Sequence, residues 1–304
     1  MIAFTPAKRE NVSLLIALAG PSGSGKTFSA LRLAYGISPA GKVAFIDTEA
    51  RRGLHYADRF KFLHYDMRPP FGPPRFIEAI TAAEEAGVEV VIIDSLSHEN
   101  DGEGGLIDMA DAIERGGTKS PGNWRVPKME HKKLVNKILQ TRISIIFCLR
   151  ADEKIRIEKQ EIDGRMKTVV VPLGWTPICE KRFMYEQTAS FTLTADRPGR
   201  PNYGLPHKVQ DQHRAFFPDG ELIGEDAGRQ LSAWARGDAP AKPSGPPEAD
   251  VAAALAAGEV AAGFSTMDPL EAFWKGLPKP IKLAIGTDKL AEWKASVAAN
   301  GREG

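Results

Sequence analysis

The stretch Val12 to Thr27, VSLLIALAGPSGSGKT, decides the fold of this chain. Its first half is an apolar run that suits a buried parallel strand, and an apolar, helically spaced run, Phe28 to Tyr35, follows it. Between the two, residues 20–27 match the phosphate-binding pattern GxxxxGK[ST]. A strand, a glycine-rich loop and a helix in this order predict a nucleoside triphosphate site, not an ordinary glycine turn.

The loop and the helix that follows it offer the groups that a polyphosphate needs. Glycines let backbone N–H groups turn toward phosphate oxygens, and the start of the helix adds the positive end of its dipole. We expect Lys26 to reach the β- and γ-phosphates and the Thr27 hydroxyl to bind Mg²⁺. The residues expected to bind ATP are Gly20, Pro21, Ser22, Gly23, Ser24, Gly25, Lys26, Thr27 and Phe28.

Two further apolar runs end in carboxylates, as strands do where a parallel sheet faces a nucleotide. Residues 42–49 (KVAFIDTE) place Asp47 and Glu49 after one strand. Residues 88–95 (VEVVIIDS) end at Asp94 in a Walker B pattern, after a helix expected near 75–86. Asp94 is expected to hold Mg²⁺, usually through water, beside the phosphate loop.

The rest of the main domain is read from periodicity and turn residues. A long Gly-rich loop over 98–127, with a short helix near 106–114, is followed by a basic helix at 128–140 and a strand at 143–149 that ends at Arg150. Alternation around Asp163-Gly164 predicts a β-hairpin over 155–171. The last expected elements are strands near 184–194 and 208–217 and a helix at 224–236.

Composition fits an ordinary globular protein, with 304 residues, 42% hydrophobic and 26% charged, and a net charge of +1. No apolar stretch approaches 18 residues, so we expect no membrane association and a cytoplasmic location. Cys148 and Cys179 lack metal-ligand spacing and are expected to fill core space, without a disulfide or zinc.

These patterns predict an α/β fold with three parts. Residues 1–236 form a P-loop core with a mostly parallel central sheet flanked by helices, residues 237–250 a Pro/Ala/Gly-rich linker, and residues 251–304 a small helical module. The core candidates of that module are Phe273, Trp274, Leu290 and Trp293. We expect it to stabilise the chain, or to bind a replication or recombination protein or DNA.

Several classes of P-loop protein are weighed by the motifs they need. The string Asn136-Lys137-Ile138-Leu139 lacks the aspartate of a guanine-reading NKxD motif, and no LSGGQ signature of ABC-type ATPases is present. A small-molecule kinase stays open, because the Arg156 to Lys167 hairpin has the basic character of a kinase lid.

The arrangement resembles the RecA-like ATPases, and in particular phage nucleotide-binding proteins of the single-strand annealing and recombination type. The resemblance covers roughly residues 10–236. It is carried by the phosphate loop, by Phe45 to Glu49, by Ile92 to Ser95, and by the strand from Ile145 to Arg150.

The resemblance implies roles for single residues. Glu49 corresponds to the carboxylate that polarises the attacking water, with Asp47 as the nearby alternative. Arg150 stands where RecA has a polar γ-phosphate sensor. Its side chain is expected either to contact phosphate directly or to form a salt bridge with Asp152 or Glu153. Lys208, with Arg214 as second choice, matches the cation that a neighbouring subunit supplies, so a homo-oligomeric ring or filament is expected.

DNA contact is expected in the loops after Asp94 and after Arg150, because basic residues outnumber acidic ones between Arg115 and Lys167. The alternative interpretation is that these charges belong to an ordinary solvated surface that does not bind DNA. The candidate DNA-binding residues are Lys119, Trp124, Arg125 and Lys128 in the first loop and Lys154, Arg156, Lys159, Arg165 and Lys167 in the hairpin.

The sequence therefore predicts an Mg²⁺-dependent ATPase, stimulated by single-stranded DNA and acting in phage-type recombination or annealing, with Lys26, Glu49, Asp94, Arg150 and Lys208 in the catalytic site. Two alternatives are a nucleotide-switched DNA- or partner-binding protein with negligible turnover, and the small-molecule kinase.

Overall fold

The fold is described from a computed structural model in which residues 4, 6–162, 165–238 and 248–301 are defined. The chain separates into two compact units, residues 1–241 and 242–304. No helix in the described ranges is long and apolar enough to cross a bilayer.

The first unit is built on a mostly parallel sheet, which confirms the predicted fold class. Along the described sheet the strand order is β3-β2-β4-β5-β1-β7-β8, and β6 pairs with β5 outside this row. The strands are β1 (Leu15–Gly20), β2 (Val43–Asp47), β3 (Leu63–Asp66), β4 (Val90–Asp94), β5 (Ser144–Ile162), β6 (Arg165–Pro177), β7 (Ala189–Thr192) and β8 (His207–Val209). Only β6 and β8 run antiparallel to the strand beside them.

The central strands are apolar throughout because both faces of the sheet are covered by helices. One core contains α1 (Lys26–Ile37) and α7 (Glu225–Arg236), and the other contains α2 (Pro73–Glu85) and α5 (Arg125–Gln140). At Gly36 the first two helices approach so closely that a Cβ atom would lie 2.1 Å from the carbonyl oxygen of Glu225.

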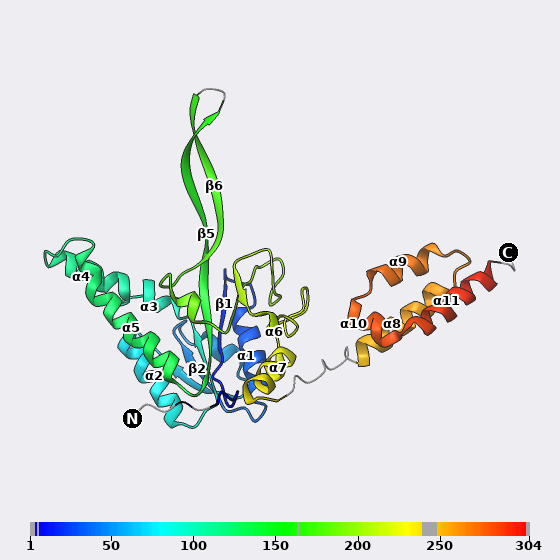
Figure 1. Cartoon of the computed structure of the whole chain (residues 1–304), viewed down its shortest axis with the longest axis horizontal. Coiled ribbons are helices and arrows are strands. Elements are labelled where there is room, and N and C mark those ends of the chain that lie inside the picture. The colour runs from blue at the N-terminus through cyan, green and yellow to red at the C-terminus, as the bar shows by residue number, and fades with distance from the viewer. Residues whose placement is uncertain (1–3, 5, 163–164, 239–247, 302–304) are drawn as a thin grey trace. The chain divides into compact units, whose positions relative to one another are not determined.

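The segment that follows β4 is more helical than the loop predicted at 98–127, although the short helix predicted near 106–114 is present. It contains α3 (Ser97–Asp101), α4 (Leu106–Arg115) and the 3₁₀ turn η2 (Gly122–Trp124) before α5 begins. In Figure 1, α4 and α5 lie side by side and project from the sheet as a helical hairpin. The length of the segment comes from this protruding pair, in which Gly105 and Gly116 flank α4.

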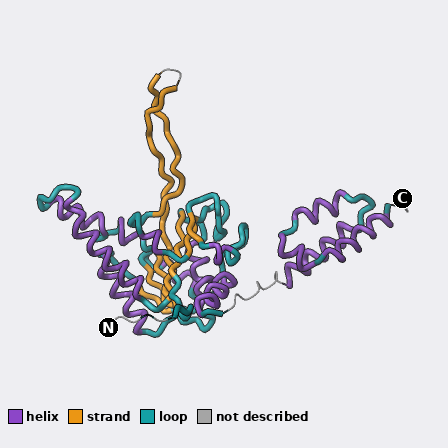
Figure 2. The backbone as a smooth tube through the Cα atoms, in the orientation of Figure 1, coloured by secondary structure: helices purple, strands orange, loops and turns teal. Residues whose placement is uncertain are grey.

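The predicted hairpin is present but longer than expected. β5 runs without a break from the core sheet into the hairpin, so β5 and β6 form one projecting arm (Figures 1 and 2). The expected Asp163-Gly164 turn lies outside the described residues.

Two late strands are shorter than the sequence predicts. Residues 183–186 form the 3₁₀ turn η3 (Phe183–Glu186) ahead of β7, and after β8 the chain turns into α6 (Asp211–Arg214). The strand expected at 208–217 is therefore wrong over most of its length. Here α6 buries His213 at 0% exposure beside the ring of Trp234, a tertiary contact that local periodicity does not reveal.

The second unit consists of α8 (Glu248–Ala262), α9 (Asp268–Gly276), α10 (Lys279–Ile285) and α11 (Thr287–Asn300). Its core centres on Trp293 and Leu270, with Phe273, Trp274 and Leu290 partly buried around them. Residues 239–247, most of the expected linker, lie outside the described part.

Candidate active site

The loop between β1 and α1 bends back on itself so that its backbone lines a cavity. Gly25 has a φ of 82°, and a Cβ atom there would lie 2.7 Å from the backbone nitrogen of Gly199. The Ser24 hydroxyl donates to the carbonyl of Pro21 at 2.8 Å and fixes the turn. Lys26 Nζ donates to the carbonyl oxygens of Gly20 and Pro21 at 2.9 and 2.8 Å, and burial lowers the pKa of its ammonium group.

Thr27 and Asp94 meet at the carboxyl edge of the sheet. The Thr27 hydroxyl donates to Asp94 Oδ2 at 2.5 Å. Burial raises the pKa of Asp94 to about 6, although the Thr27 hydrogen bond and the Lys26 charge oppose the rise. In the neighbouring strand β5, burial and Asp94 raise the pKa of the Cys148 thiol well above its usual range.

This hydroxyl and carboxylate are hard oxygen donors of the type that Mg²⁺ prefers, so the residues fit that cation. Within the described ranges no cluster of three or more His, Cys, Asp or Glu is placed to hold a metal. A bound Mg²⁺ would therefore complete its octahedron with phosphate and water oxygens.

Glu49 lies at the same edge, just beyond the end of β2. Its Oε1 accepts hydrogen bonds from Arg150 Nε at 3.0 Å and Nη2 at 2.8 Å. Arg52 Nη1 lies 3.6 Å from the other carboxylate oxygen, and the Glu49 side chain is 18% exposed. The salt bridge of Arg150 is thus made with Glu49, whereas the sequence suggested Asp152 or Glu153.

Asp47, the alternative to Glu49, is fully buried and already occupied. Its Oδ1 accepts the backbone N–H of Glu49 at 2.8 Å, and its Oδ2 accepts that of Gly53 at 2.8 Å and lies 3.1 Å from His64 Nε2. Both carboxylate oxygens therefore hold the turn that presents Glu49. Of the two carboxylates, Glu49 is the one that lines the cavity, where Arg150 holds it.

His98 on α3 connects this turn to the end of β4. Its Nδ1 is hydrogen-bonded to Thr48 Oγ1 at 2.7 Å, and its Nε2 lies 4.0 Å from Glu49 Oε1. Burial, together with the nearby Arg150 charge, lowers the pKa of His98. A neutral imidazole in this position holds the turn that carries Glu49 and places no second positive charge beside the Glu49 carboxylate.

A cavity of about 970 Å³ brings most of these residues together. It is lined by the phosphate loop, Lys26, Thr27, Glu49, Asp94 and Arg150. Among the lining residues that the sequence analysis did not place in the site are Arg52, His55, Tyr56 and Trp175. The first three follow Glu49 on the short turn η1 (Arg52–Tyr56), whose length gives no periodic signal, and Trp175 comes from the returning strand β6.

Three predicted residues lie elsewhere. The Phe28 ring packs near Tyr56, with ring centroids 6.0 Å apart, and does not line the cavity. Ser24 is buried at 0% exposure and is not among the residues that line the described cavity. Lys208 lies on the terminal strand β8, where its Nζ donates to the carbonyl of Tyr185 at 2.5 Å, and it is not among the residues that line the described cavity.

The two groups of predicted DNA-binding residues lie on separate projections. Lys119, Trp124, Arg125 and Lys128 gather where α4 turns into α5, with Lys119 Nζ 3.8 Å from Glu114. Lys154 and Arg156 are exposed on the arm. Lys159, Arg165 and Lys167 also belong to its strands, but their side chains lie outside the described part. Figure 1 shows the arm and the α4–α5 hairpin projecting apart.

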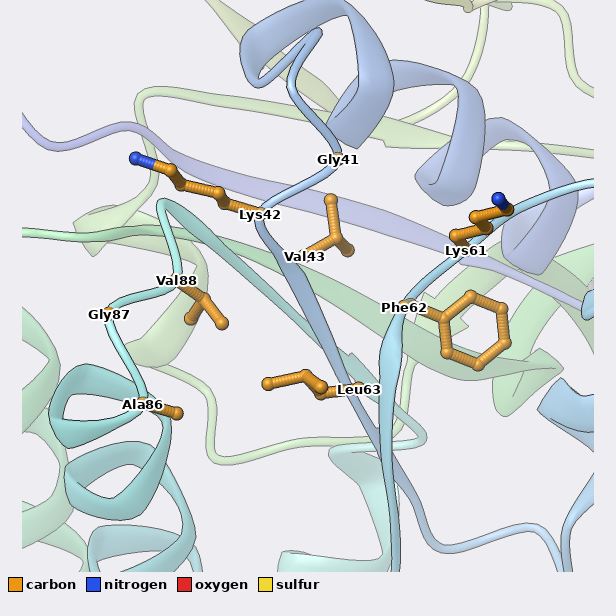
Figure 3. Close-up of a pocket in the computed structure, with 9 residues that line it drawn as sticks. All are labelled: Gly41, Lys42, Val43, Lys61, Phe62, Leu63, Ala86, Gly87 and Val88. Atoms are coloured by element: carbon orange, nitrogen blue, oxygen red, sulfur yellow. The ribbon is translucent and has the colours of Figure 1, made fainter.

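A second hollow, of about 300 Å³, lies at the opposite, amino edge of β2, β3 and β4. In Figure 3 the side chains of Val43, Leu63 and Val88 face it, while the ammonium groups of Lys42 and Lys61 point away. Lys42 instead pairs with Glu89 at 3.1 Å. This apolar hollow brings no reactive groups together.

Comparison with known proteins agrees with the geometry of the carboxyl edge. A family model described as an AAA domain matches residues 13–173, just over half of the chain. The matched range includes the phosphate loop, Glu49, Asp94 and Arg150. None of the curated proteins matches this sequence.

Proposed function

Because the chain belongs to the AAA domain family of P-loop ATPases, we propose that it hydrolyses Mg·ATP in order to act on single-stranded DNA, in phage-type recombination or annealing. The observation that carries the DNA part is the basic α4–α5 hairpin, which follows directly from the strand that ends in Asp94.

The hydrolytic step asks the protein mainly for positioning and for neutralisation of charge. Lys26, Arg52 and Arg150 are cations that line the cavity beside the phosphate loop. Mg²⁺, held beside Thr27 and Asp94, would neutralise the charge on the phosphate oxygens. Glu49 accepts the proton of the attacking water once its carboxylate is released from Arg150. A γ-phosphate competes with Glu49 for the guanidinium group of Arg150, and this competition releases the Glu49 carboxylate.

The DNA surface is supported by charge and exposure. Residues 115–140 contain seven Lys or Arg and one Glu. On α5, Arg125, Lys128 and Lys132 are exposed and follow one another at intervals of three and four residues, so they form one row along the helix. A row of cations suits the phosphates of a single strand, and the half-buried Trp124 ring at its start suits a stacked base.

Buried contacts link this surface to the nucleotide site. Glu99 on α3 is 2% exposed, and its Oε1 lies 2.9 Å from His131 Nδ1 on α5. Two residues earlier on α3, the Ser97 hydroxyl accepts the backbone N–H of Arg150 at 2.9 Å. A movement of Arg150 toward phosphate therefore has a path of short contacts to the helix that carries the basic row.

The test is steady-state ATP hydrolysis by the purified chain with and without single-stranded DNA, at low and moderate salt, with Lys26→Ala as the blank. Stimulation by DNA that weakens as salt rises is the expected result. Turnover that is indifferent to DNA at every salt concentration contradicts the DNA part. Transfer of labelled γ-phosphate to an acceptor other than water would support the kinase instead.

The Arg150–Glu49 pair favours one second candidate, a nucleotide-switched binding protein with negligible turnover. A carboxylate that stays bound to a guanidinium cannot take a proton from water. This candidate predicts tight ATP binding, ATP-dependent DNA or partner binding and no phosphate release. The variant Glu49→Gln distinguishes the two candidates. The ATPase loses turnover by this change, whereas the switch has no turnover to lose.

A further inference from the structure

The hydroxyl of Thr48 determines which ring nitrogen of His98 carries the proton. Its oxygen accepts the backbone N–H of Ser95 at 2.7 Å and lies 3.0 Å from the carbonyl oxygen of Ser95. Because a carbonyl has no proton to give, the single proton of the hydroxyl points to that carbonyl. The contact of 2.7 Å between Thr48 Oγ1 and His98 Nδ1 is then a hydrogen bond that Nδ1 donates. This is the assignment in which all three contacts are hydrogen bonds.

The other ring nitrogen, Nε2, therefore carries a lone pair when the imidazole is neutral. Burial and the charge of Arg150 lower the pKa of His98, which favours the neutral form. Nε2 makes no hydrogen bond to any described residue and lies 4.0 Å from Glu49 Oε1. The lone pair of Nε2 and the carboxylate of Glu49 are both acceptors, so a hydrogen bond between them needs one added proton.

Packing keeps the imidazole in this orientation. The ring of Phe71 stacks on it, with centroids 4.9 Å apart and an angle of 20° between the planes. The hydrogen bond to Thr48 fixes the rotation of the ring within that plane. The His98 side chain is 12% exposed, so it has little room for another rotamer. Nε2 is thus held beside the carboxylate that meets the attacking water in the proposed hydrolysis.

The charges around the imidazole change when Arg150 moves. Burial has the largest effect and lowers the pKa of His98; Arg150 at the end of the core part of β5 lowers it further, whereas Glu49 after β2 and Asp101 on α3 raise it. Phe71, on the stacked side, is uncharged. In the proposed hydrolysis a γ-phosphate neutralises the Arg150 charge while both acids stay. The imidazole then becomes a stronger base at the moment when Glu49 is released.

We propose that His98 Nε2 takes from Glu49 the proton that the attacking water gives up, so that His98 is a positioning residue that acts through Glu49. The inference rests on the proposed hydrolysis of ATP and adds a second proton acceptor to it. It gives a role to a buried imidazole that lies outside the phosphate loop and does not touch the nucleotide cavity.

The proton passes in two steps. The water oxygen bonds to the γ-phosphorus and its proton goes to the Glu49 carboxylate, while the bond from phosphorus to the ADP oxygen breaks and leaves its electron pair on ADP. The carboxylic acid then gives the proton to Nε2, which restores the carboxylate and leaves an imidazolium. When phosphate leaves and Arg150 returns, its charge disfavours the imidazolium, which releases the proton to solvent.

The first experiment is steady-state phosphate release between about pH 5.5 and about pH 9, a range that brackets an imidazole pKa. The test variant is His98→Asn, because the amide N–H can replace Nδ1–H toward Thr48 while Nε2 is lost. The matched control is His207→Asn on β8, an exposed imidazole whose Nδ1 lies 2.8 Å from the carbonyl oxygen of Leu205. Melting temperature and ATP binding show that both variants keep the fold and the nucleotide site.

The expected result is turnover at least about tenfold lower in His98→Asn than in the wild type and the control at pH 8, with ATP binding kept. This difference should shrink as pH falls through the pKa of the imidazole, because a protonated His98 cannot take a proton. A deficit that is equal at every pH, or no deficit, overturns the relay alone. A wild type without turnover overturns the proposed hydrolysis and the relay with it.

Nitrogen-15 NMR of the histidine rings tests the relay without turnover. The chain has six histidines, and the spectrum of His98→Asn identifies the signal of His98. The chain without nucleotide should show the Nδ1–H tautomer for the neutral ring, and Arg150→Gln should raise the pKa of His98. An Nε2–H tautomer, or a pKa that Arg150→Gln does not raise, overturns the relay even where ATP is hydrolysed.

Discussion

At the carboxyl edge of the sheet, charged side chains are buried or partly buried and are held by short contacts, such as those from Thr27 to Asp94 and from Arg150 to Glu49. On the two projections that leave this edge, the charges lie in water. The projections also differ from each other, because residues 115–140 carry seven bases and one acid whereas residues 152–167 carry five of each. Chemistry needs fixed, desolvated charges, whereas recognition of a polymer or a second chain needs exposed surface.

The largest expected effect tests whether the carboxyl edge alone carries the chemistry. Lys26→Ala removes the cation beneath the phosphate loop, so ATP binding weakens and turnover falls by about 1000-fold, the range for loss of one preorganised charge. Isothermal titration with ATP and a phosphate-release assay measure the two quantities. Lys42→Ala at the amino edge is the control and should leave both unchanged; equal losses in the two variants would contradict a site confined to one edge.

The next effect separates the two carboxylates that follow β2. Glu49→Gln should keep ATP binding and lower turnover by about 100-fold, since it removes the proton acceptor but keeps the shape. Asp47→Asn should instead lower the melting temperature, because Asp47 holds two backbone N–H groups and His64. If Glu49→Gln kept normal turnover and Asp47→Asn were stably folded but inactive, Asp47 and not Glu49 would be the proton acceptor.

A third prediction contrasts the two projections directly. Replacing Lys119, Arg125 and Lys128 with alanine should weaken binding to single-stranded DNA roughly 30-fold and lower the slope of log K against log salt by about 2, which corresponds to three phosphate contacts. Lys154→Ala with Arg156→Ala on the neutral arm should change both by far less. Fluorescence anisotropy with a labelled oligonucleotide at several salt concentrations measures them, and equal losses from both projections would erase the contrast.

The smallest expected effect concerns the contact between His131 on α5 and Glu99 on α3, which joins the basic α4–α5 hairpin to the carboxyl edge of the sheet. His131 is buried, which lowers the pKa of its imidazole, but the hydrogen bond and charge of Glu99 and the charge of Glu180 outweigh burial and raise that pKa above the ordinary 6.5. Stability from this pair is full below pH 6.5 and is lost as pH rises through the folded pKa. His131→Gln should therefore cost about 1 kcal/mol at pH 6 and less at pH 8.5.

Urea unfolding of the wild type and His131→Gln at the two pH values measures this difference. A cost of His131→Gln that grows with pH would contradict the charged pair.

His213 should show the opposite pH dependence. Burial lowers the pKa of His213, so its contribution to stability is present above pH 6.5 and is lost as pH falls toward the folded pKa.

Local signals in the sequence predicted much of the first unit. Helix α4 was expected at 106–114 and spans 106–115, and α2 was expected at 75–86 and spans 73–85. Among the elements that were missed, β3, η1 and α6 are four or five residues long, too short for a period to show, and are fixed by contacts with distant elements.

By itself, the sequence determined the phosphate loop, the Walker B strand and the α/β class, because each rests on contiguous residues whose pattern has a local physical meaning. Only the tertiary structure decided the partners: Glu49 meets Arg150 across 101 residues, and Thr27 meets Asp94 across 67. It also decided that the arm carries exposed apolar side chains and that the basic segment is a helical hairpin. Such contacts depend on strand order and register, which pairing between distant segments selects and which periodicity along one segment does not encode.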